Sequence, residues 1–267
     1  MFYRSYTKAP AGLSAFVRHA KSWNFFPRRG VSGFCRLKMG DAISQRPSGR
    51  DISLALAECV IVSALFVADA YHHIFFSKTP YLFLLGWASI RWRGMRWKDV
   101  GFAWPSNWKA ALLVGVLCGL FIEAFELFIS QPLLARWMGK MPDLSNFSAV
   151  HGNLKVTLIY ILLIWMLAAF GEELVYRGYL MNRLAGLFRG TRAAWVASLL
   201  VISAVVFGCS HTGQGATGML ENIWDGLLLG AVYLACGRNL TAVIVTHGVT
   251  DTVDLLLMYW GKYPGMR

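Results

Sequence analysis

The sequence predicts an all-α integral membrane protein, a bundle of about seven to eight transmembrane helices. Hydrophobic residues make up 56% of the 267 residues and charged residues only 15%, whereas soluble proteins carry about 25% charged residues. Apolar runs long enough to cross a bilayer, which takes about 20 helical residues, recur after residue 50. The 11 tryptophans fit this class, because indole rings anchor helices at membrane interfaces.

The apolar runs define the expected helices in chain order. We place them near residues 52–75, 80–91, 108–130, 155–188, 193–211, 219–237 and 240–260. The second run is too short to span a membrane by itself. The third is expected to end at Gln131-Pro132, since proline cannot continue a regular helix.

The first 50 residues differ from the rest of the chain. They contain ten Lys or Arg residues, a single acid, Asp41, and no apolar run of spanning length. Three interpretations fit: a disordered basic tail on the cytosolic side, an organellar presequence, or an extension upstream of a start at Met39. We expect a dispensable tail at residues 1–50, followed by a transmembrane helical domain at 51–267.

The net charge of +12 does not indicate nucleic-acid binding. Basic residues lie in the tail and in short links between apolar runs, which is the positive-inside pattern of membrane proteins. The expected partner is therefore the lipid bilayer and not nucleic acid. The five cysteines form no CxxC pair, so neither a disulfide framework nor a cysteine zinc site is predicted.

Charged side chains within the apolar runs are the candidates for function. Each costs about 2.5–3.5 kcal/mol to place at membrane depth, so such residues mark functional sites by default. These candidates are Glu58, Asp69, Glu123, Glu126, Glu172, Glu173, Arg177, His211, Glu221, Asp225, His247, Asp251 and Asp254.

The strongest group is Glu172-Glu173-xxx-Arg177, directly after an apolar run. Glu173 and Arg177 are four residues apart on one helical face and can pair. Glu172 lies on a different face of the helix and does not pair with Arg177. An unpaired carboxylate in a medium of low dielectric constant is a better base than a paired one. We therefore expect Glu172 to be a general base, supported by Glu173 and Arg177.

Two further groups carry histidines. Phe207 and His211 are four residues apart, so the two rings can pack together. A helical hairpin folded at the break 189–192 would place His211 at a depth similar to that of Glu172. His247 and Asp251 are also four apart, a spacing that suits two metal ligands or an imidazole oriented by a carboxylate.

Together these groups supply a carboxylate base, two imidazoles and a second carboxylate. Such a set can bind and activate a water molecule, with or without a metal ion, and hydrolysis is the reaction that it suits best. The HExxH motif of soluble zinc peptidases and the GxSxG motif of serine hydrolases are both absent.

The three motifs, in this order and in successive membrane helices, resemble the signature of the CAAX-processing and bacteriocin-processing intramembrane proteases. This family is also called Abi or CPBP and contains the type II CAAX prenyl endopeptidases. The resemblance covers about residues 80–260, a protease core, and includes the Trp-rich stretch 96–102 as the family's amphipathic link.

The resemblance implies a bundle of about eight transmembrane helices. It implies that Glu172 activates water for attack on a peptide carbonyl, that His211 holds that water or the oxyanion, and that His247 and Asp251 complete the polar site. Zinc held by Glu172, His211, His247 and Asp251 is one expected cofactor arrangement, and a metal-independent glutamate mechanism is the other.

The family does not define the substrate beyond a membrane-associated protein or peptide. The short loops resemble those of bacterial members, so we expect a multi-pass protein of the bacterial inner membrane. Two alternative functions predict different sequence features. A catalytically silent immunity or scaffold protein of the same fold would be expected to lose Glu172 or His211, and a proton-coupled transporter would show two related halves.

Overall fold

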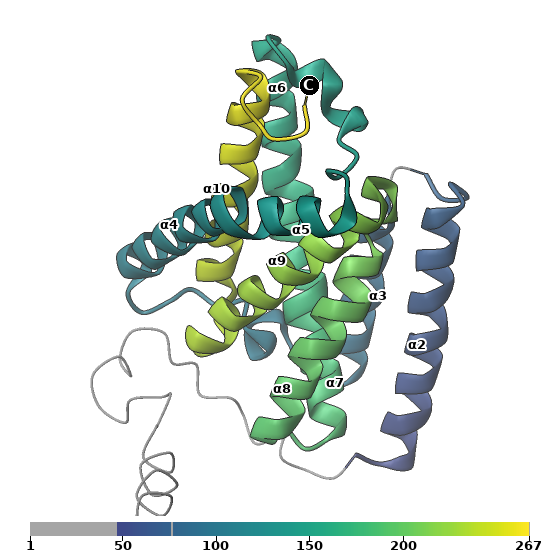
Figure 1. Ribbon diagram of the computed structural model, residues 1–267. Coiled ribbons are helices and arrows are strands. Elements are labelled where there is room, and N and C mark those ends of the chain that lie inside the picture. Colours follow the sequence, from purple (N-terminus) through teal and green to yellow (C-terminus); the bar gives the residue numbers. More distant parts are fainter. Residues whose placement is uncertain (1–46, 76, 267) are drawn as a thin grey trace, which may run out of the picture. The chain divides into compact units, whose positions relative to one another are not determined.

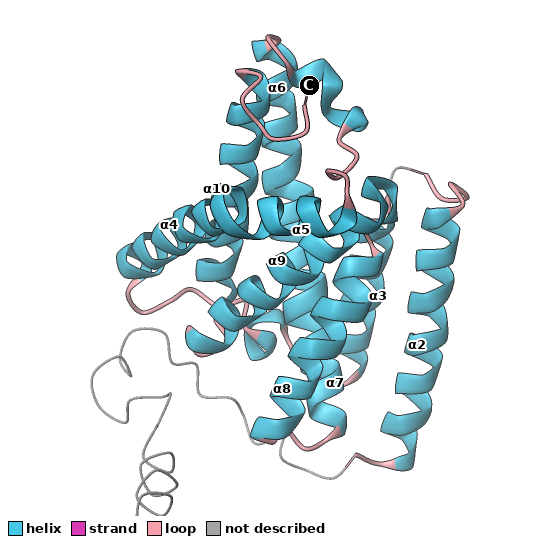
Figure 2. Ribbon diagram, viewed as in Figure 1, coloured by secondary structure: helices cyan, strands magenta, loops and turns pink. Residues whose placement is uncertain are grey.

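The computed structural model describes residues 47–75 and 77–266, and within this part every regular element is a helix (Figure 2). The all-α prediction is therefore confirmed. Seven continuous helical rods of the described chain correspond to the seven apolar runs. The predicted basic tail lies outside the described residues, apart from residues 47–50.

Length and composition identify which rods can cross a membrane. Four described helices qualify: Gly49–Ala70, Trp108–Met138, Leu154–Leu187 and Leu240–Tyr259. The bent pair Arg192–Phe207 and Thr212–Ala235, with 59° between its halves, makes a fifth if it counts as one span. Large apolar side chains such as Leu56, Phe121 and Phe128 are exposed on these rods, which is the surface expected of a protein in lipid.

Helices α2 (Gly49–Ala70) and α3 (Lys78–Trp92) lie side by side at one edge of the fold (Figure 1). Ser48 begins α2 with a capping box: its side chain accepts from the Asp51 backbone N–H, and Asp51 accepts from the Ser48 N–H. Little of α2 is buried, but Glu58 binds Arg183 at 2.6 Å and thereby attaches this helix to the core.

The third rod continues past the position where we expected it to end. It comprises α4 (Trp108–Phe125), the π-helix η3 (Glu126–Ser130) and α5 (Gln131–Met138). The predicted end at Gln131-Pro132 is wrong because Pro132 follows the π-helix as an N-terminal residue of α5. There its missing N–H breaks no regular i→i−4 bond.

This rod crosses α10 (Leu240–Tyr259) in close contact (Figure 1). Gly115 and Gly119 form a GxxxG pattern, the pattern by which membrane helices approach closely. A Cβ atom on Gly115 would lie 2.6 Å from Cβ of Val245, and one on Gly119 would lie 2.8 Å from the Thr246 carbonyl oxygen. Glycine at both positions therefore allows α4 to rest on the α10 backbone.

The fourth rod contains α6 (Leu154–Leu163), the π-helices η5 (Ile164–Glu172) and η6 (Leu174–Met181), and α7 (Asn182–Leu187). The chain reverses at Arg189 and Gly190, which both have positive φ, and continues into α8 (Arg192–Leu200) and η7 (Val201–Phe207). The predicted helical hairpin at 189–192 is confirmed. Helix α9 (Gly215–Ala235) follows the bend and precedes α10.

The short 3₁₀-helix η2 (Trp97–Val100) lies within the Trp-rich stretch and contacts the core. The Trp97 ring stacks on Phe83, with 5.3 Å between ring centroids. The carbonyl oxygen of Val100 accepts hydrogen bonds from the Tyr233 hydroxyl at 3.1 Å and the Asn182 amide at 3.4 Å. This link therefore attaches α9 and the fourth rod to the segment between α3 and α4.

Candidate active site

A cavity of about 240 Å³ lies where η3, η5, η7, α9 and α10 meet, closed on one side by the 144–147 segment. Four of the six residues predicted for the catalytic site line this cavity: Glu172, His211, His247 and Asp251. The other two, Glu173 and Arg177, are fully buried behind its wall. The structure thus places the three sequence motifs around one space, although they are far apart in the chain.

Glu173 is the centre of a buried hydrogen-bond network. Its Oε1 atom accepts from Arg177 Nη1 at 2.7 Å and from His247 Nδ1 at 2.8 Å. The pairing of Glu173 with Arg177 predicted from their spacing is confirmed. Arg177 also donates to the Gly226 carbonyl oxygen at 2.8 Å, and its guanidinium lies 4.9 Å from the centre of the Phe207 ring. One arginine therefore joins the fourth rod, η7 and α9.

His247 lies between two carboxylates. Nδ1 faces Glu173, and Nε2 lies 3.5 Å from Asp251 Oδ2. The second contact is longer than a good hydrogen bond, so Asp251 restrains the ring only weakly. Because Glu173 holds Nδ1, the orientation of this imidazole is determined mainly by a residue 74 positions away in the sequence.

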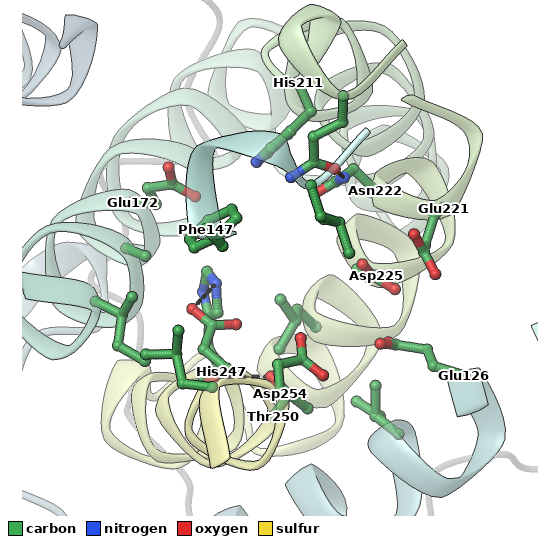
Figure 3. Close-up of a pocket in the computed structure, with 18 of the residues that line it drawn as sticks. Glu126, Phe147, Glu172, His211, Glu221, Asn222, Asp225, His247, Thr250 and Asp254 are labelled. Carbon is green, nitrogen blue, oxygen red and sulfur yellow. Dashed lines mark hydrogen bonds and ion pairs between the residues drawn. The ribbon is translucent and has the colours of Figure 1, made fainter. Parts of the chain in front are cut away.

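His211 follows η7 and points into the cavity (Figure 3). Its Nδ1 lies 3.0 Å from the Phe207 carbonyl oxygen and 3.0 Å from Ser210 Oγ, and its ring packs on Phe207 as predicted. A carbonyl oxygen only accepts, so Nδ1 donates in that contact and Nε2 is left as an acceptor.

Lys78 lies behind the cavity and contacts the segment that carries His211, a role that the sequence does not predict. Its ammonium group binds Asp69 at 2.9 Å and donates to the carbonyl oxygen of Ser210, next to His211, at 3.3 Å. It begins α3, in a run whose apolar pattern alone indicated only a short helix. No local signal could have identified its role, because Ser210 lies 132 residues further along the chain.

Glu172 differs from its neighbour Glu173. Its carboxylate faces the cavity (Figure 3), and among the described residues no hydrogen bond or ion pair to it is found. The adjacent positions diverge because successive residues of a helix point about 100° apart. Glu172 is therefore the carboxylate that a water molecule in the cavity can reach.

The opposite side of the cavity is also acidic. Glu126, Glu221, Asp225 and Asp254 gather there (Figure 3). The sequence predicts these residues as charges at membrane depth, but its three motifs do not include them. Tyr263 lines the cavity beyond the end of α10, and burial raises the pKa of its phenol well above the usual range. Its hydroxyl therefore stays protonated, and it accepts from Gln131 Nε2 at 2.6 Å.

The predicted zinc ligands share the cavity, but they do not converge on one point. Within residues 47–75 and 77–266, no three His, Cys, Asp or Glu side chains are arranged so that they could hold a metal ion. Both ring nitrogens of His247 face carboxylates. Zinc therefore stays a prediction from the sequence, and the chemistry below is derived from the protein's own groups.

Comparison with known proteins agrees with the motifs. Residues 154–253 match the model of a family described as type II CAAX prenyl endopeptidase Rce1-like. No curated protein and no solved structure matches the chain. The matched segment runs from the start of α6 into α10 and contains all six predicted catalytic residues. The similarity of this multi-pass membrane protein to that protease family therefore lies in residues 154–253, the segment that carries all three motifs.

Proposed function

We propose that this protein is an intramembrane endopeptidase in which Glu172 activates the attacking water. The observation that carries the proposal is the difference between two adjacent carboxylates. Glu173 is bound by Arg177 and His247, whereas Glu172 faces a polar cavity and makes no hydrogen bond or ion pair with the described residues. A base must have a free lone pair directed at the proton that it removes.

The first step is attack by water on the carbonyl carbon of a peptide. Glu172 takes one proton from the water, while Nε2 of His211 accepts the hydrogen bond from its second proton and so orients it. The water oxygen then forms a bond to the carbonyl carbon, and the carbonyl oxygen becomes an oxyanion. His247 acts as an imidazolium: Nδ1 donates to Glu173, and Nε2 is placed to donate to that oxyanion, since only the 3.5 Å contact with Asp251 competes for this proton.

The second step breaks the peptide bond. The tetrahedral intermediate collapses, and Glu172 returns the proton to the departing amine, so that the base is regenerated. Asp251 receives the His247 N–H again when the product leaves. Glu173 and Arg177 are positioning residues, because they fix the imidazole without touching the substrate.

The proposed mechanism does not require a metal ion. Its support is that both nitrogens of His247 face carboxylates, those of Glu173 and Asp251, and that Nδ1 of His211 faces the Phe207 carbonyl oxygen. The proposed substrate is a membrane-associated protein or peptide. We place the protein in the bacterial plasma membrane, because its helices are joined by short links, and fractionation of membranes from the source cells tests that location.

The test uses the full chain reconstituted in lipid nanodiscs with a pool of membrane-anchored peptides, analysed by mass spectrometry. The wild type is expected to produce defined fragments, and Glu172→Gln to lower the rate by about 10²–10⁴-fold. Asp99→Asn, an exposed acid in η2, is the matched control and should cleave normally. Equal cleavage by the wild type and Glu172→Gln would refute the assignment. A silent immunity or scaffold protein would cleave nothing.

A further inference from the structure

The cavity has a second wall that the proposed reaction does not use. We call Glu126, Glu221, Asp225 and Asp254 the acidic face. They come from η3, α9 and α10 and lie across the cavity from Glu172 (Figure 3). The carboxyl groups of Glu126 and Asp225 lie close enough to interact. Asp254 is likewise close to Glu123, which is buried behind it.

Among the described residues, the basic side chains that line the cavity with the acidic face are His211 and His247. The residues that line the cavity include no Lys or Arg. The buried basic groups nearest to the core are bound elsewhere: Arg177 to Glu173, Arg183 to Glu58 and Lys78 to Asp69. Two touching carboxyl groups can share one proton. Sharing still leaves several acceptor oxygens around the cavity.

Buried acceptors without donors provide an independent indication of a ligand. Oε1 of Glu221 has no hydrogen-bond partner in the described part of the chain, and Glu221 is only 7% exposed. Oε1 of Gln131, which is 2% exposed, has no partner either. The Gln131 side chain lies beside Glu221 and donates to Tyr263, so it is directly behind the same wall. Buried acceptors cost free energy unless a donor reaches them.

The rest of the wall is apolar. Ile122, Leu229, Leu255 and Met258 line the cavity beside the carboxylates. An aliphatic chain with a cationic head matches this combination, because its stem packs on apolar surface while its head meets acceptors. Ammonium groups carry three donors and guanidinium groups five. The described carboxylates do not converge closely enough to hold a metal ion. An ammonium or guanidinium group has several N–H donors, so it can reach acceptors that are spread over the wall.

We propose that the acidic face is a binding subsite for an alkylammonium or alkylguanidinium group. On the function proposed above, on which its biological role rests, this group is the Lys or Arg side chain of the substrate peptide. Because Glu172 and the acidic face share one cavity, the basic residue lies next to the bond that is cleaved. The enzyme therefore selects membrane-anchored peptides by a basic residue at the cleavage site.

The first arm of the test measures cleavage. N-terminally acetylated peptides that differ only in having Lys, Arg or norleucine near the cleaved bond are compared in nanodiscs. Acetylation removes the terminal amine as a competing source of the cation. Lys and Arg peptides should be cleaved at least about tenfold more efficiently than norleucine peptides, as expected for charge-assisted hydrogen bonds. In Glu221→Gln/Asp225→Asn this preference should fall to within about twofold, and in Asp99→Asn it should persist.

The second arm does not depend on cleavage. Butylguanidinium is expected to raise the melting temperature of the wild type, and butylurea, which has a similar shape but no charge, is not. The single variant Glu221→Gln should weaken this stabilisation even if the double variant folds poorly. Cleavage without preference for basic residues, together with no effect of butylguanidinium, would overturn the subsite and leave the peptidase intact. Butylguanidinium binding without any cleavage would support the subsite and overturn the peptidase.

Discussion

Glu172 and Glu173 are adjacent in the chain, but only Glu173 is bound to the protein, through Arg177 at 2.7 Å and His247 at 2.8 Å. The two carboxylates therefore have different tasks. Glu173 stabilises the fold and orients an imidazole, whereas Glu172 is available to the cavity. This division predicts different phenotypes for the same substitution at neighbouring positions.

Glu173→Ala is expected to destabilise the protein by about 3–5 kcal/mol, because it leaves the buried Arg177 guanidinium without its carboxylate. The free energy of unfolding in mixed detergent and denaturant measures this loss. Glu172→Ala is the matched control and should unfold like the wild type while losing cleavage. Equal stability of the wild type and Glu173→Ala would contradict the proposed role of Glu173.

Lys78→Met is expected to lower kcat with little change in KM. The substitution keeps the length of the side chain but removes the donor that holds the Ser210 carbonyl oxygen, so His211 is positioned less accurately. A small misplacement of a catalytic group can cost up to about 10²-fold in rate. Lys78→Arg should recover part of the rate. A variant that loses substrate binding instead would show that Lys78 acts on the substrate.

Gly119→Ala is expected to destabilise the contact between α4 and α10 by about 1–3 kcal/mol, since the new Cβ atom would lie 2.8 Å from the Thr246 backbone oxygen. Thermal unfolding of the purified protein measures the effect. Gly186→Ala in α7 is the control, because a Cβ atom there meets nothing within 4 Å. If both variants melt at the same temperature, the helices are not held at this spacing.

Metal removal distinguishes the two cofactor arrangements expected from the sequence. Treatment with 1,10-phenanthroline followed by dialysis should leave peptide cleavage unchanged, because the proposed mechanism uses only Glu172, His211 and His247. Metal content measured on the same sample is the control for removal. Loss of cleavage that zinc restores would instead support the zinc arrangement.

The sequence was most informative about structural properties that are determined within a single helical segment. Hydropathy predicted the membrane class and the seven rods, and the helical period predicted the contact of Glu173 with Arg177 and that of Phe207 with His211. It was misleading at Pro132, where the π-helix η3 allows the rod to continue. A π-helix shifts the register of the helix that follows it, and residue spacing in the sequence gives no simple signal of that shift.

The amino-acid sequence by itself determined which segments are helical, which faces of them are polar and which neighbours pair one turn apart, because these depend on local geometry and on transfer to lipid. Tertiary structure alone decided that His247 binds Glu173, that Lys78 holds the loop at Ser210, and that the acidic face opposes Glu172. These contacts depend on how closely and at what angle the helices cross. That geometry arises from the packing of whole surfaces, such as the glycines of α4 against α10.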